Sequence, residues 1–130
     1  MKITCQHIAA NCNPMPSAFD FLTNSLIVYC YKNQVGIYDL DQKTVFRNIH
    51  PKKQPYPNRA NTIKTFQSTE KHYIIVGYDS GELVVYGSTD MLEWTEDHWV
   101  KQKNSILSLS LHNDFLAVNN NDALITVYKI

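Results

Sequence analysis

The sequence predicts an all-β fold made of about three four-stranded antiparallel units, and two observations carry the prediction. A pattern of apolar strand, polar turn and second strand ending in tyrosine occurs three times, and no segment shows convincing helical periodicity. The composition agrees, because 44% of the 130 residues are hydrophobic, 12% are aromatic and 18% are charged. Residues 1–130 are long enough for one domain with its own core and too short to predict two.

The repeat is visible as three segments that align without a gap. They are Leu26–Asp39, Ile74–Gly87 and Leu116–Lys129. In each segment a valine precedes a tyrosine by ten positions (Val28 and Tyr38, Val76 and Tyr86, Val118 and Tyr128). The segments start 48 and then 42 residues apart, at 26, 74 and 116, close to the roughly 40 to 45 residues of a four-stranded propeller blade. The three tyrosines are predicted to be packing residues.

Each segment is predicted to be a β-hairpin, because a polar turn separates its two apolar runs. Lys32-Asn33 forms the first turn, and Asp79–Gly81 provides the second with a glycine that can take positive φ. The third turn, Asn119–Asp122, contains asparagines that tolerate the same region of φ.

Further strands flank the hairpins. Alternating segments precede them at 18–22, 62–66 and 105–111, and more polar fourth strands follow at 43–49 and 92–99. Residues 91–100 could also form a short helix, but the repeat register favours a strand. The predicted blades are therefore approximately 14–50, 60–100 and 104–130, the last without a fourth strand, and residues 1–10 are a candidate closing strand.

This arrangement resembles the WD-repeat β-propeller family, with Tyr38-Asp39 where the tryptophan-aspartate pair ends the third strand. No Gly-His pair opens a blade, so most of the hydrogen-bond network typical of strong repeats is missing. Residues 10–14, 26–29 and 33–39 are most similar to the N-terminal part of the WD-repeat subunits of the Elongator complex, with Asn48-Ile49-His50 where the next blade would begin. The similarity covers roughly the first 50 residues.

The resemblance implies a non-catalytic scaffold that binds other protein subunits of a complex modifying wobble uridines of tRNA, with a weak tRNA contact. It implies about three WD-like four-stranded antiparallel blades, incomplete or completed by another chain or by missing sequence. Blades bury their faces only against neighbours, so an open stack needs a partner. A fragment of a longer protein, self-association through open blade faces and a compact non-propeller β domain are the alternatives.

Charge and cysteine usage exclude several function classes. Lysine plus arginine number 12 and aspartate plus glutamate number 12, so the basic excess of a typical nucleic-acid binder is absent. The three cysteines form no C-x-x-C pair, and no cofactor or metal is predicted. Glu96 and His98 would share a strand face, but a third ligand is lacking. Without an apolar run of about 18 residues or a nucleophile motif, we predict neither a membrane protein nor an enzyme, and a cytoplasmic or nuclear location.

The segment 50–59 departs from the repeat, since it combines basic, proline and tyrosine residues between two blades. Lys52, Lys53 and Arg59 could contact phosphates while Tyr56 stacks on a base, which makes a small RNA-binding β module the rival hypothesis. A solvated loop is the plainer interpretation. Trp94 and Trp99 would lie on opposite faces of a strand, and Trp99 is the candidate for a partner contact.

Overall fold

A computed structural model describes residues 1–5 and 12–130, and in those residues it contains strands and no helix. The all-β prediction is confirmed. Eleven strands form three antiparallel sheets. The first sheet has the order β1 (Phe19–Phe21), β2 (Leu26–Tyr31), β3 (Gln34–Asp39), β4 (Thr44–Ile49). The middle sheet has the order β5 (Ala60–Gln67), β6 (His72–Tyr78), β7 (Glu82–Ser88), β8 (Thr95–Lys101). The third sheet has three strands, β9 (Ile106–His112), β10 (Phe115–Asn120), β11 (Ile125–Lys129).

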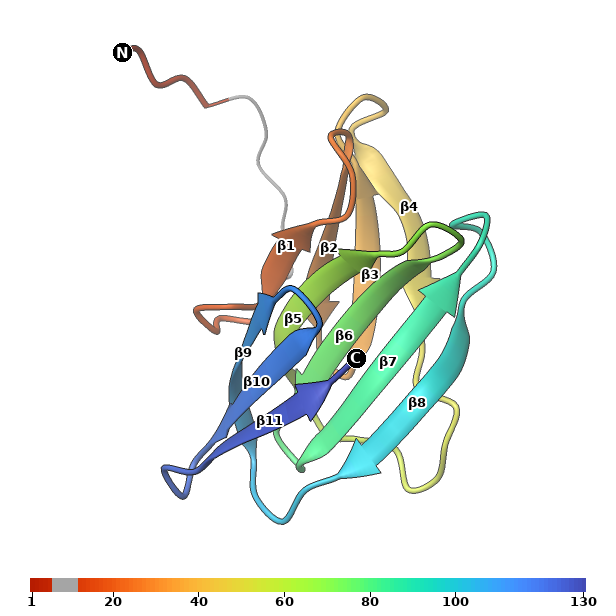
Figure 1. Cartoon of the computed structure of the whole chain (residues 1–130). Helices are drawn as coiled ribbons and strands as arrows, with labels where there is room; N and C mark the ends of the chain where they lie inside the picture. The colour runs from red at the N-terminus through yellow and green to blue at the C-terminus, as the bar shows by residue number, and fades with distance from the viewer. Residues whose placement is uncertain (6–11) are drawn as a thin grey trace.

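Each sheet is a meander of consecutive strands, and the three sheets are stacked with the β5–β8 sheet in the middle (Figure 1). The first strand of the middle sheet, β5, contacts β1 and β2 on one side and β9 on the other. Within the described residues the sheets do not close into a ring, and the propeller arrangement, incomplete or completed by another chain or by missing sequence, stays a prediction. Residues 1–5 belong to no strand, and the rest of the candidate closing strand lies outside the described residues.

Two cores hold the stack together, one on each face of the middle sheet. The first contains Val28 and Ile37 from the first sheet and Ile74 and Tyr86 from the middle sheet. The second lies between the middle and third sheets and consists of Ile75, Leu83, Ile106, Leu109, Leu116 and Val118. Because successive side chains of a strand point to opposite faces, the Ile-Ile-Val run of β6 supplies both cores. A sheet buried on both faces needs such a run.

The strand register shows which positions of the three sheets are equivalent. The same cross-strand pair occurs as Ile27–Tyr38, Ile74–Tyr86 and Leu116–Tyr128. Tyr29, rather than Val28, therefore corresponds to Val76, and the gapless alignment is wrong by one residue in the first sheet. The cause is the first turn, where Tyr31 pairs with Gln34 across only two residues.

The turns use positive φ as predicted in two of the three hairpins. Gly81 has φ 95° and Lys32 has φ 52°. In the third hairpin the residue with positive φ is Ala123, at 61°, and not one of the predicted asparagines. Asn120 instead extends β10 and is buried, so the turn starts later than the sequence pattern suggests.

Two asparagines join neighbouring sheets through backbone carbonyls. The Asn13 amide nitrogen donates to the carbonyl oxygens of Lys32 (2.8 Å) and Ala60 (2.9 Å), and its Oδ1 accepts from the Lys32 amide (2.9 Å). The buried Asn61 side chain donates to the Ile106 carbonyl at 2.9 Å. Such bonds fix each pair of sheets in one relative position. Asn13 belongs to the segment that resembles the WD-repeat subunits, and its role here is structural.

Buried hydroxyl and thiol groups predict a loss of stability at alkaline pH. Burial raises the pKa of Tyr86 to about 12. Burial also raises the pKa of Tyr78, whose hydroxyl lies 3.1 Å from that of Tyr86, well above its usual value. Burial also raises the pKa of Cys30 to about 12. The folded chain retains these protons to a higher pH than the unfolded chain does. The contribution of these groups to stability is therefore complete below their pKa values in the unfolded chain, and it is lost as pH rises through their pKa values in the folded chain.

We therefore expect the free energy of unfolding to fall from about pH 9 upward, at about 1.4 kcal/mol per pH unit for each group in its window. Urea unfolding curves over a pH series measure this. Tyr86→Phe and Cys30→Ser should each reduce the slope. Equal slopes in the wild type and both variants would contradict the assignment.

Candidate functional site

The predicted loop at residues 52–59 connects β4 to β5, and most of its charges already have partners. The Lys52 amide donates to the Glu96 carboxylate at 2.6 Å. Lys53 places its ammonium 4.7 Å from the ring centroid of Trp99. Arg59 lies 3.7 Å from Asp79, at the other end of the loop.

Tyr56 is 52% exposed and is the one aromatic ring of this loop. The structure therefore brings Lys53 and Trp99 together, while Arg59 is held by Asp79 on the β6–β7 turn. The predicted basic cluster is divided between two parts of the fold. Trp99 packs against the first core, so a part of its ring is unavailable to a partner.

The contact between Lys53 and Trp99 is a cation–π pair that pins the loop to β8. We expect Lys53→Met to lower the free energy of unfolding by about 0.5–1 kcal/mol, the value of such a pair at an exposed site. Trp99 fluorescence in a Trp94→Phe background, followed during urea unfolding, measures the change. Lys52→Met is the matched control, since the contact of Lys52 uses its backbone amide. Equal effects of the two substitutions would show that the ring contact is not stabilising.

Glu96 and His98 do not share a face, contrary to the sequence-based expectation. His98 pairs with Val85 and Glu96 pairs with Tyr86, because the register shifts between those two β7 residues. The bulge turns the two side chains to opposite sides of the sheet. In residues 1–5 and 12–130 no group of three or more His, Cys, Asp or Glu side chains is placed to hold a metal ion. That range also contains no helix able to cross a bilayer.

The two tryptophans also differ from the prediction of opposite faces. Trp94 precedes β8 rather than lying in it, and its indole N–H donates to the Met91 carbonyl at 3.1 Å. It is buried in the first core, against which Trp99 also packs. Both rings therefore serve the same interface between sheets, and residues 92–94 form neither the predicted strand nor a helix.

The first open face lies on the side of the β1–β4 sheet away from the middle sheet. A row of apolar side chains crosses all four strands there: Phe21, Ile27, Tyr38 and Val45 are paired in register. Phe21 is 56% exposed and Val45 is 45% exposed. This row contains no charged residue. An uncovered row of this kind is unusual for a sheet face in contact with water, where polar side chains normally alternate with buried ones.

The second open face lies on the outer side of the third sheet. Its central row is Ser110, Ala117 and Val127, with Phe115 and Ile125 in the neighbouring rows. Phe115 is 51%, Val127 59% and Ile125 70% exposed. The stack thus ends on both sides in a sheet surface with exposed apolar side chains, which on the third sheet lie beside His112, Lys129 and Asn119.

Equivalent rows are covered elsewhere in the same chain. In the middle sheet the row that corresponds to the first open face is Thr65, Ile74, Tyr86 and Glu96, and it packs on the first sheet. In the third sheet the corresponding row is Leu111, Leu116 and Tyr128, and it packs on the middle sheet. Tyr38 occupies the position equivalent to the buried Tyr86 and the half-buried Tyr128. It faces outward, so the prediction that it packs in the core is wrong. The sequence contained these rows, but without the register they could not be assigned to a face.

Comparisons with known proteins define no family for this chain: no protein-family model and no curated protein matches it. Among solved structures, it is similar to the crystal structure of the computationally designed Ika4 protein, with a TM-score of 0.45 and 9% sequence identity. The similarity covers 98% of this chain and 99% of that one.

Proposed function

We propose that the chain is a non-catalytic protein-interaction scaffold that holds protein partners against its two open sheet faces. The row of Phe21, Ile27, Tyr38 and Val45 carries this proposal, because the rows equivalent to it in the other two sheets are covered by a neighbouring sheet. Removing exposed aromatic and β-branched side chains from water contributes about 25 cal/mol per Å² of apolar area, before the entropy cost of association is subtracted.

The occupant that fits the open faces best is a sheet of the same kind, and a second copy of the chain offers one. Inside the chain, the Ile75–Val85 side of the middle sheet meets the Leu116–Tyr128 side of the third. The corresponding contact between copies joins Ala117–Val127 of one copy to Ile27–Tyr38 of the next. Two copies joined head to tail at both ends would give six sheets, within the four to eight of the usual closed rings.

The resemblance to WD-repeat subunits of the Elongator complex suggests where such a scaffold works, among protein subunits that support wobble-uridine modification of tRNA in the cytoplasm or nucleus. This part of the proposal is supported only by the motifs in residues 10–39. Direct RNA binding through residues 52–59 is less favoured, since Lys53 and Arg59 already have partners.

A pair of charge substitutions tests the head-to-tail contact. Phe21→Asp disables the first open face and Val127→Asp disables the second, and both positions are more than half exposed, so that each variant should fold. We expect the wild type to associate, neither variant to associate alone, and the two mixed variants to form a one-to-one heterodimer through their intact faces. Light scattering after size exclusion measures the masses. Thr89→Asp, at an exposed site that belongs to neither face, is the control.

A wild type with the mass of a single chain at its highest soluble concentration, together with no heterodimer on mixing, would overturn the self-association account. Association that survives both substitutions would show that the open faces are not the contact.

A further inference from the structure

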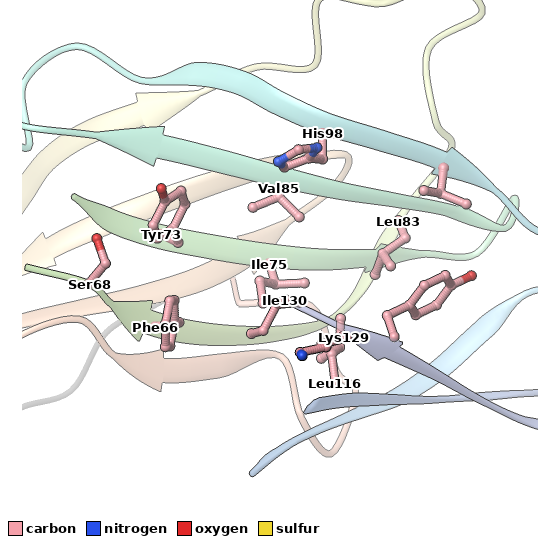
Figure 2. A pocket seen from close by; sticks show the side chains of 12 residues that line it. Phe66, Ser68, Tyr73, Ile75, Leu83, Val85, His98, Leu116, Lys129 and Ile130 are labelled. Carbon is pink, nitrogen blue, oxygen red and sulfur yellow. The ribbon is translucent and has the colours of Figure 1, made fainter. Parts of the chain in front are cut away.

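The geometry points to a strand-binding groove between the middle and third sheets, which we infer accepts an extended segment of a partner protein paired with β11. The groove has a volume of about 480 Å³. Figure 2 shows Phe66, Tyr73, Val85 and His98 on its middle-sheet side and Ile130 at the end of β11. This groove lies on the inner side of the third sheet, opposite its open face, and shares only the strand β11 with that face, so the inference goes beyond the proposed scaffold function.

The first observation is the unpaired edge of β11. In the described residues β11 pairs with β10 alone, whereas the equivalent strands β3 and β7 each have a fourth strand, β4 or β8, on their outer side. Backbone N–H and C=O groups along such an edge are a template for another strand. Pairing by main-chain hydrogen bonds at an exposed edge is a known mode of peptide recognition.

The second observation is that the groove lies where an added strand would lie. A strand beside β11 is about 4.8 Å from it and about 10 Å above the sheet below. That position is over β7 and β8, where the third sheet leaves Val85 half-buried and Val100 38% exposed. The first sheet, which packs on the opposite face of the middle sheet, does have a fourth strand. That strand, β4, supplies Ile49 to the core that also contains Trp94.

The lining defines the chemistry of the occupant. Apolar side chains dominate it, and no acidic residue is among the described residues that line it. His98 and Lys129 are present instead. An extended segment with apolar side chains at alternate positions would direct these onto Val85 and Val100, and an acidic side chain near its end would complement Lys129. The outward positions of such a segment are polar.

Selection from displayed random short peptides tests the groove. The wild-type chain is the bait, and Val100→Asp and Ile130→Asp are the counter-selection variants, both at exposed groove positions that should tolerate substitution. We expect the selected peptides to alternate apolar and polar residues and to bind each groove variant at least tenfold more weakly. Phe21→Asp, in β1 of the first sheet and outside β11, should bind these peptides as the wild type does, even if this substitution abolishes self-association. The two proposals therefore fail or succeed separately.

Backbone methylation distinguishes strand pairing from apolar adsorption. A selected peptide is synthesised twice, with N-methyl groups at odd or at even positions, and its affinity is measured by fluorescence anisotropy. Because alternate N–H groups of a strand point to opposite sides, one set should abolish binding and the other should leave it nearly unchanged. The inference is overturned if both sets bind, if the groove variants bind as well as the wild type, or if no peptide is enriched.

Discussion

Tyr86→Ala is expected to lower the free energy of unfolding by about 3–5 kcal/mol, the usual cost of removing a large aromatic side chain from a core. Tyr86 is 1% exposed and lies between the first and middle sheets, where its hydroxyl is paired with that of Tyr78. The substitution leaves a cavity and also removes the partner of a buried hydroxyl.

Tyr38→Ala is the matched control, because Tyr38 holds the equivalent position on the first open face. Its loss should cost about 1 kcal/mol or less, as for a surface substitution. Urea unfolding of the two variants under conditions in which the chain is monomeric measures the difference. Equal losses would mean that the first sheet is covered on both sides, and the open-face account would be wrong.

Gly77→Ala is expected to lower stability by about 1–3 kcal/mol through overpacking. A Cβ at this position of β6 would lie under 3.0 Å from side-chain carbons of Ile106 and Thr62, at the contact between the middle and third sheets. Neither neighbour can move without shifting its strand, because Ile106 and Thr62 are fully buried.

Gly36→Ala is the matched control for Gly77. A Cβ there would also lie under 3.0 Å from another residue, but the atoms are at the far end of the Tyr29 side chain, on the side of the first sheet away from the middle sheet. Tyr29 is 9% exposed but belongs to neither core, so we expect a smaller loss of stability than for Gly77→Ala. Thermal unfolding of both variants measures the two losses of stability. A larger loss for Gly36→Ala than for Gly77→Ala would contradict the arrangement of the sheets.

Local pattern was sufficient to predict the strands and hairpins, because turn residues and apolar runs are read over a few positions. Register was not predictable at that level. A turn shorter by one residue moved the first repeat by one position, and a bulge in β8 separated Glu96 from His98. Both features depend on pairing between strands, which single-sequence periodicity does not report.

The sequence predicted that partners bind to open sheet faces, but it did not predict which residues form those faces. Open sheet surfaces follow from the number of sheets, but the row from Phe21 to Val45 is recognisable only when the four strands are paired. The predicted contact residues Lys53 and Trp99 came together as a pair that stabilises a loop, which reduces their value as a partner surface. The groove beside β11 had no sequence signal, since its lining comes from both the middle and the third sheets.

The most direct test of the three-sheet stack is amide hydrogen exchange resolved by strand and measured over a range of protein concentrations. Amides of β6, which supplies buried side chains to the cores on both faces of the middle sheet, should exchange only through global unfolding, while those of β3 and β10 should exchange faster in dilute solution and gain protection as copies associate. Equal protection of β3, β6 and β10 that does not change with concentration would contradict the account.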